Sequence, residues 1–232
     1  MSFKRWIVSK ADKDLAAQLS EESGIHPFLV YLLTMRGIDT VEDVSEFLLG
    51  GEWTDDPFAF ADMDVAVERI QRALDTQETI AVFGDYDADG VTATVLLYSY
   101  LRDRGARVSY LVPEREGTGY GLHTETIDTL ADRGATLIIT VDNGIAAVEE
   151  VAYAATKGID VVVTDHHQPQ DTLPAAVAVV DPHRVDCGSE WKDYAGVGVA
   201  FKLICALEGD ADGLLAEYAD LVAVGTLADV MP

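Results

Sequence analysis

Beyond residue 76, short apolar runs alternate with segments of helix length, and this alternation limits the possible folds more than any other feature. The runs are nearly continuous in apolar, often β-branched residues, which is typical of strands buried on both faces of a parallel sheet. They cover residues 79–83, 108–112, 136–141, 160–164 and 176–180. Amphipathic segments of helix length lie at about 91–104, 124–133 and 145–157, and residues 197–208 and 214–231 are also predicted to be helical. We therefore predict an α/β fold, a doubly wound and mainly parallel five-stranded sheet with flanking helices.

The N-terminal part has a different pattern, in which apolar residues recur at helical spacing between glycine-containing turns. Segment 63–74, for example, repeats apolar residues every three or four positions behind Asp62, a predicted N-cap. His26 stands before a proline, and we expect it to begin a helix rather than to bind a ligand. The expected organisation is a helical N-terminal region over 1–60 and a second domain over 61–232.

Composition narrows the function further. The net charge of -25 over 232 residues argues against a broad basic surface for nucleic acid. Bound divalent cations would reverse that field locally, so a phosphodiester substrate stays possible. The chain has no apolar run long enough to span a membrane and no apolar signal segment at its start, so we expect a cytoplasmic protein. Cys187 and Cys205 lack the spacing of a metal or redox pair, and we expect them to be reduced.

Acidic residues or histidines follow four of the five predicted strands. The segments that carry them are GDYDADG at 84–90, Asp142-Asn143-Gly144, Asp165-His166-His167 and Asp181-Pro182-His183. The carboxyl ends of parallel strands line one crevice, where ligands bind in open α/β sheets. We therefore expect these polar side chains to converge. One such turn can be a solvated acidic loop, but four strand ends with the same chemistry indicate a site.

Three alternating acids, Asp85, Asp87 and Asp89, make the first of these segments a candidate metal loop. Carboxylates this close repel one another unless a cation or a proton lies among them. The loop begins like an EF-hand, but position twelve of that motif would be Leu96 where glutamate is required. Asp229 is a further candidate, because it lies in an apolar segment where we expect it to be buried and to need a partner.

Oxygen ligands with one or two imidazoles suit Mn²⁺ or Mg²⁺ better than a thiolate zinc site. Several carboxylates able to bridge suggest two ions, the arrangement that hydrolyses phosphate esters. The sequence contains no P-loop and no serine or cysteine nucleophile with an evident partner base, so neither ATP use nor covalent catalysis is indicated.

The segments GDYDADG, VDNG, TDHHQP and LADVMP, in this order and spacing, resemble the four motifs of the DHH phosphoesterase superfamily. Other segments resemble its bacterial branch of single-strand-specific 5′-to-3′ DNA exonucleases: LLTMRGIDTVEDVSEFL, PEREGTGYGL, VVDPHR and GVGVAFKL. The resemblance covers essentially the whole chain. It implies hydrolysis of single-stranded DNA in repair or recombination, with two Mn²⁺ or Mg²⁺ ions.

The resemblance also implies roles for single residues. It makes metal ligands of Asp85, Asp87, Asp142, His166 and Asp229. Asp89 is expected to support the ligands, and Asp165 to orient His166 through a hydrogen bond. His167 is expected either to contact the scissile phosphate or transfer a proton, or to pack beside the ligands. Expected substrate contacts are Arg115, Tyr120, His183 and Arg184.

Three expectations stay open at this point. Residues 196–198, Gly-Val-Gly, suit either close packing or a phosphate at a helix start. Members of the exonuclease branch continue into a second domain, whereas this sequence stops at Pro232, so we expect weak binding of DNA. Alternative functions are a phosphodiesterase for short oligonucleotides or cyclic dinucleotides and a catalytically silent scaffold, although every expected acid is present.

Overall fold

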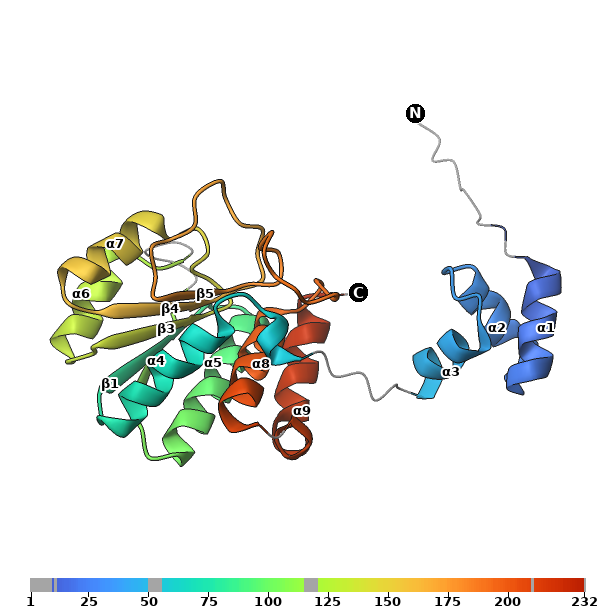
Figure 1. Cartoon of the computed structure of the whole chain (residues 1–232), viewed down its shortest axis with the longest axis horizontal. Coiled ribbons are helices and arrows are strands. Elements are labelled where there is room, and N and C mark those ends of the chain that lie inside the picture. Colours follow the sequence, from blue (N-terminus) through green and yellow to red (C-terminus); the bar gives the residue numbers. More distant parts are fainter. Residues whose placement is uncertain (1–9, 11, 50–55, 115–120, 210, 232) are drawn as a thin grey trace. The chain divides into compact units, whose positions relative to one another are not determined.

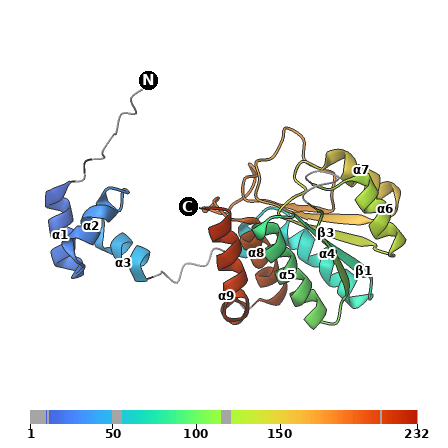
Figure 2. The same cartoon turned by 180° about the vertical axis from the view of Figure 1, so that it is seen from behind.

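The computed structural model describes residues 10, 12–49, 56–114, 121–209 and 211–231. The chain divides into two compact units, Met1–Thr54 and Asp55–Pro232, where the sequence suggested a boundary at residue 60. Figure 1 and Figure 2 show the chain from opposite directions. Among the described residues, no helix has the length and apolar character needed to cross a bilayer.

The N-terminal unit contains the short helices α1 (Lys13–Ser23), α2 (Pro27–Thr34) and α3 (Val41–Leu49). The Asp12 carboxylate accepts two backbone N–H groups at the start of α1, and Gly24 ends that helix with a left-handed backbone. His26 begins α2, where its Nδ1 accepts the N–H of Phe28, so the expectation of a helix-start histidine is confirmed. The buried core of this unit includes Ala16, Leu19 and Val30.

The second unit is built on a five-stranded sheet in which every pair of neighbouring strands is parallel. Its strands are β1 (Thr79–Gly84), β2 (Arg107–Leu111), β3 (Leu137–Val141), β4 (Asp160–Thr164) and β5 (Ala178–Val180). Their order across the sheet is β2-β1-β3-β4-β5, with Gly84 opposite Val141 and Val141 opposite Thr164. The predicted doubly wound, parallel sheet is confirmed.

Helices cover both faces of the sheet (Figure 1). They are α4 (Met63–Asp75), α5 (Ala88–Asp103), α6 (Thr124–Asp132), α7 (Val148–Thr156), α8 (Gly196–Glu208) and α9 (Ala211–Ala228), after a 3-10 turn η1 (Pro57–Ala59). Alternate side chains of β1 point to opposite faces: Ile80 and Val82 pack with α4, α5 and α8, whereas Ala81 and Phe83 pack with α6 and α7. Burial of the larger side chains, Ile80, Val82 and Phe83, stabilises the fold by about 1.5–3 kcal/mol each.

The strand order places a crevice between β1 and β3. The chain leaves β1 through α5 on one face of the sheet, and it leaves β3 through α7 on the other. The turns after these two strands therefore separate, and ligands of doubly wound proteins bind where such turns separate. The acids at the ends of β1 and β3 lie at this switch point.

Two local features differ from the sequence predictions. Asp62 holds the N-cap position of α4 but has a left-handed backbone and caps nothing; its carboxylate accepts the N–H of Val179 and pairs with Arg184 instead. Both partners of the Asp62 carboxylate lie more than a hundred residues along the chain, so the local sequence pattern could not reveal them. Helix α5 begins at Ala88, three residues early, because the Asp87 side chain accepts the N–H of Gly90 and caps it. Cys187 and Cys205 are not joined in a disulfide, as expected.

Candidate metal centre

The loop after β1 turns from strand to helix within a few residues. Two glycines permit this turn: a Cβ atom on Gly84 would overlap Thr94, and one on Gly90 would lie 2.6 Å from the backbone of Asp85. Asp85 and Asp89 are 4% and 1% exposed, while Asp87 remains exposed at the start of α5. The Oδ1 atom of Asp85 is buried without a hydrogen-bond partner among the described residues. A buried, unpartnered carboxylate oxygen fits a cation ligand.

Asp142 follows β3 with a left-handed backbone, φ 60°, which costs about 1–2 kcal/mol for a residue other than glycine. The next residue, Asn143, is buried and donates its side-chain N–H to the Val141 carbonyl. Asp142 itself is 2% exposed and faces the loop after β1. The strained turn thus carries a carboxylate into the crevice.

The Asp165 carboxylate organises the turn after β4. One oxygen, Oδ1, accepts the backbone N–H groups of His166 and His167, and the other accepts the N–H of Ile145. The ring that Asp165 contacts is that of His167, whose Nδ1 lies 2.7 Å from Oδ1. The expectation that Asp165 orients the His166 ring is therefore wrong: the carboxylate folds back over the two following residues and reaches only the second ring.

The His166 ring instead faces three acids. Its Nε2 atom lies 3.0 Å from Asp142 Oδ1, 3.8 Å from Asp229 Oδ2 and 3.9 Å from Asp89 Oδ2. Ligand atoms lie within 4.8 Å of one another in three groups, which are Asp85-Asp87-Asp142, Asp142-His166-His167 and Asp89-His166-Asp229. Asp142 and His166 each belong to two groups. All five residues expected to bind metal are thus brought together from four segments of the sequence, and Asp142 lies where one carboxylate can serve two ions.

Asp89 has a second set of partners. Its carboxylate accepts the N–H of Gly196 at 2.6 Å and that of Val197 at 2.9 Å, which caps the start of α8. A Cβ atom on Gly196 would lie 2.4 Å from the Cβ of Asp142. The Gly-Val-Gly segment therefore serves close packing: its first two N–H groups bind Asp89 and are not available to a phosphate.

Asp229 lies just after α9 and is less buried than the sequence suggested. Its side chain is 31% exposed, because it is placed at the rim of the crevice by the end of α9 and not inside the apolar core. The expectation that Asp229 is buried is wrong, but its carboxylate does face His166, as the expected need for a partner implies.

Burial changes the acid–base chemistry of the cluster. It raises the pKa of Asp142 to about 7, and it also raises the pKa of Asp85 and of Asp89. Burial alone would lower the pKa of His166, but the hydrogen bond and charge of Asp142 outweigh it and raise that pKa to about 9. Burial disfavours the negatively charged form of these carboxylates, and a divalent cation bound among them would stabilise that form.

The four expected substrate contacts have different outcomes. Arg184 is 8% exposed at its side chain, and four of its five N–H groups bind Asp62, Asp186 and the Val179 carbonyl. The expectation that it contacts substrate is corrected, because the guanidinium is committed to the fold. His183 follows β5, and burial together with the charge of His166 lowers its pKa. Arg115 and Tyr120 lie outside the described residues.

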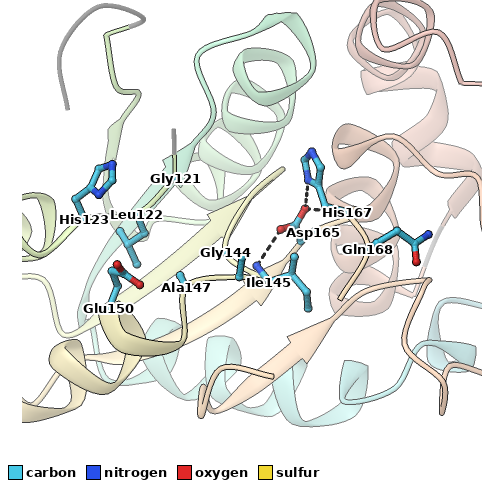
Figure 3. Close-up of a pocket in the computed structure, with 11 residues that line it drawn as sticks. Gly121, Leu122, His123, Gly144, Ile145, Ala147, Glu150, Asp165, His167 and Gln168 are labelled. Carbon is cyan, nitrogen blue, oxygen red and sulfur yellow. Dashed lines mark hydrogen bonds and ion pairs between the residues drawn. The ribbon is translucent and has the colours of Figure 1, made fainter. Parts of the chain in front are cut away.

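A cavity of about 270 Å³ lies beside His167, as Figure 3 shows. Its walls are mainly backbone and small aliphatic side chains around Gly144 and Ala147, with polar groups from His123, Glu150 and Gln168. No lysine or arginine lines it among the described residues. The sequence had indicated His123 as a helix-start residue, and it does stand before α6, although it makes no capping bond.

Sequence reasoning assigned no role to two residues near the cluster. Asp181 is fully buried at the end of β5, and burial raises its pKa to about 7. Its place at a strand end was visible in the sequence. Gly225 of α9 packs against Asp89, and a glycine inside a helical pattern is the signal that could have revealed this close approach.

The fold and the cluster together define a doubly wound α/β domain with an oxygen-rich cation site at its switch point. The chain belongs to the DHH family, because the family's N-terminal domain matches residues 79–226. This match confirms the resemblance seen in the sequence motifs.

Relatives of known name cover nearly all of this chain. The single-stranded-DNA-specific exonuclease RecJ of Bacillus subtilis (strain 168) is 43% identical over 229 residues, which are 98% of this chain and 29% of that protein. RecJ of Escherichia coli (strain K12) is 41% identical over 96% of this chain and 40% of its own length. The crystal structure of RecJ in complex with Mn²⁺ from Thermus thermophilus matches with a TM-score of 0.76 and 30% identity, over 97% of this chain and 32% of that chain. This chain therefore spans less than half the length of these relatives.

Proposed function

We propose that this chain is the catalytic core of a RecJ-like 5′-to-3′ exonuclease that hydrolyses single-stranded DNA in repair or recombination. The observation that carries the proposal is the convergence of Asp142 and His166 with the acids after β1 and α9. Similarity to single-strand-specific exonucleases over nearly the whole chain supports it. We further propose that the protein acts in the cytoplasm, where bacterial DNA is found.

Two Mn²⁺ or Mg²⁺ ions are the proposed cofactors. Asp85 and Asp87 would hold one ion, His166 and Asp229 would hold the other, and Asp142 would bind both. The donor set fits these metals, since it offers carboxylate oxygens and one imidazole nitrogen but no thiolate. When bound, such ions activate a water molecule and stabilise charge on phosphate oxygens. With a net charge of -25, the protein also needs them to attract a polyanion.

His167 is proposed to act on the phosphate group or on a proton of the reaction. Its side chain is 45% exposed, so it can meet a substrate, while the Asp165 carboxylate fixes one ring nitrogen. The hydrogen bond to Asp165 raises the pKa of His167, which favours the protonated ring near neutral pH. A protonated imidazole can donate to a phosphate oxygen or to a leaving oxygen.

The cavity beside His167 is the proposed place for part of a nucleotide next to the scissile phosphate. Its walls carry the acid Glu150 and, among the described residues, no lysine or arginine, so they suit a sugar or base better than a second phosphate. His183, Arg115 and Tyr120 stay candidates for further contacts with the DNA backbone and bases. Asp89 is proposed to support the ligands and not to bind an ion, because both its oxygens bind backbone N–H groups.

A substrate panel tests this proposal. The protein is assayed with Mn²⁺ at low salt on 5′-labelled single-stranded DNA, a dinucleotide and a cyclic dinucleotide, beside Asp142→Ala. We expect 5′ mononucleotides from the DNA and none from the variant. Turnover of the cyclic dinucleotide alone would indicate the small-substrate phosphodiesterase. No turnover of any substrate, with Mn²⁺ bound, would favour the silent scaffold.

A further inference from the structure

Gly225 is buried in α9, although most residues around it on that helix are partly or fully exposed. A Cβ atom at this position would lie 2.5 Å from Thr92 Oγ1, and 2.7 Å from both Asp89 Oδ1 and Val197 Cγ1. The backbone of α9 therefore touches α5 and the start of α8 directly. Glycine inside a helix costs about 1 kcal/mol relative to alanine, so this position gives up helix stability for close approach.

The atoms that face Gly225 are held in place from elsewhere. The Thr92 hydroxyl donates to the carbonyls of Ala88 and Asp89. The Asp89 carboxylate is fixed by the two N–H groups at the start of α8. Neither group is the loose end of a flexible side chain. A methyl group at position 225 would therefore displace α9 and leave its neighbours in place.

That displacement would reach Asp229 directly. The Asp229 N–H donates to the Gly225 carbonyl at 2.9 Å, so the acid lies one helical turn beyond the glycine on the same hydrogen-bonded path. Opening contacts of 2.5–2.7 Å to the 3.4 Å of ordinary contact moves α9 by roughly 0.7–0.9 Å. Metal–ligand distances tolerate only about 0.2 Å.

We propose that Gly225 is a positioning residue of the metal centre, whose missing side chain lets α9 dock on Asp89 and so carries Asp229 to the ion that His166 binds. This inference rests on the proposed function, because it assumes the two-ion centre. If the inference is correct, the affinity for one ion depends on the position of α9 and the affinity for the other does not. The ion that Asp85 and Asp87 would hold depends on the loop after β1 and not on that helix.

Titration of Mn²⁺ into the metal-free protein, followed by calorimetry and by the electron paramagnetic resonance of free Mn²⁺, tests the proposal. For Gly225→Ala we expect about 10- to 100-fold weaker binding of one ion, the loss typical of residues that support ligands. The other ion should keep its affinity within about twofold. Val224→Ala, an exposed neighbour on α9, is the matched control and should bind both ions as wild type does.

A rescue variant separates positioning from general damage. Asp229→Glu alone should weaken the same ion, because the longer side chain overshoots. In the double variant Gly225→Ala/Asp229→Glu, the extra methylene lets the carboxylate at position 229 reach the ion from the displaced helix. This variant should therefore bind that ion more tightly than Gly225→Ala does. Circular dichroism in EDTA should show all variants folded.

Three results would overturn the proposal: two ions bound by Gly225→Ala at wild-type affinity, equal weakening of both ions, or no rescue by Asp229→Glu. If Gly225→Ala does not fold, Asp229→Glu beside Val224→Ala still decides, because the proposal requires it to weaken one ion only. Failure of the proposed function would look different, since wild type itself would then bind no Mn²⁺.

Discussion

The Nε2 atom of His166 lies 3.0 Å from Oδ1 of Asp142, and this contact joins the turn after β4 to the turn after β3. Around it gather acids from the loop after β1 and from the end of α9. Asp142 and His166 influence each other's protonation, and a proton on either one competes with a bound cation. We therefore expect metal binding to depend on pH. Asp142 belongs to two of the three candidate ligand groups, and we propose that both ions depend on it.

Mn²⁺ affinity should rise with pH. Protons on Asp142 and His166, whose pKa values are raised to about 7 and about 9, compete with the cation for the same atoms. Binding should therefore tighten from about pH 6 to about pH 9, and binding at pH 7 should release protons. Calorimetry at pH 7 in two buffers of different ionisation enthalpy measures this release. Equal heats in both buffers would contradict the prediction.

Asp142→Ala should weaken both ions, whereas Asp87→Ala should weaken chiefly one. Asp142 belongs to two of the three ligand groups and Asp87 to one. We expect the loss for Asp142→Ala to exceed the roughly 100-fold upper range of residues that only support ligands. Asp132→Ala, which removes an exposed acid at the end of α6, controls for the change in net charge. Retention of one tight ion by Asp142→Ala would contradict the shared role.

His167→Ala should lower kcat by about 10²- to 10⁴-fold while Mn²⁺ affinity changes little, as expected for a residue that handles a proton. Asp165→Asn adds a sharper readout. The Asp165 carboxylate raises the pKa of His167, so its loss should lower that pKa and move the alkaline fall of activity to lower pH. An unchanged pH–rate profile in Asp165→Asn would exclude His167 as the titrating group.

Arg184→Ala should destabilise the protein without changing Mn²⁺ affinity. The guanidinium joins Asp62 before α4 to Asp186 and to the end of β5. Loss of these charged hydrogen bonds should cost about 1.5–3 kcal/mol in urea unfolding. Arg133→Ala, at an exposed position, should change stability by less than about 0.5 kcal/mol. Wild-type stability with weakened DNA binding would instead restore the substrate contact expected from the sequence.

The sheet could be predicted from the sequence because strands buried on both faces leave continuous apolar runs, and parallel strands bring their carboxyl ends together. The same rule predicts that Asp85, Asp142 and His166 lie in one crevice. Local spacing also indicated that His26 begins a helix.

Contacts between distant segments could not be predicted this way. Asp89 caps a helix that starts 107 residues later, and Arg184 pairs with an acid 122 residues earlier. Asp165 bonds the ring of His167 and not that of His166 because its carboxylate folds back over the next two residues. The sequence does not specify that conformation. Packing of Gly225 on Asp89 depends on how closely α9 approaches α5. The Asp89 cap and the Arg184 pair have no local pattern, and the contact between Asp165 and His167 is local but depends on side-chain conformation. Only the glycine inside the helical pattern of α9 could have indicated the close approach at Gly225.

Anomalous diffraction from crystals grown with Mn²⁺ tests the proposed two-ion centre most directly. We expect two peaks roughly 3.5–4 Å apart, the spacing of two-metal sites. One should lie between Asp85, Asp87 and Asp142, and the other between Asp142, His166 and Asp229. Absence of both peaks from this crevice, or ions bound there without Asp142, would contradict the proposal.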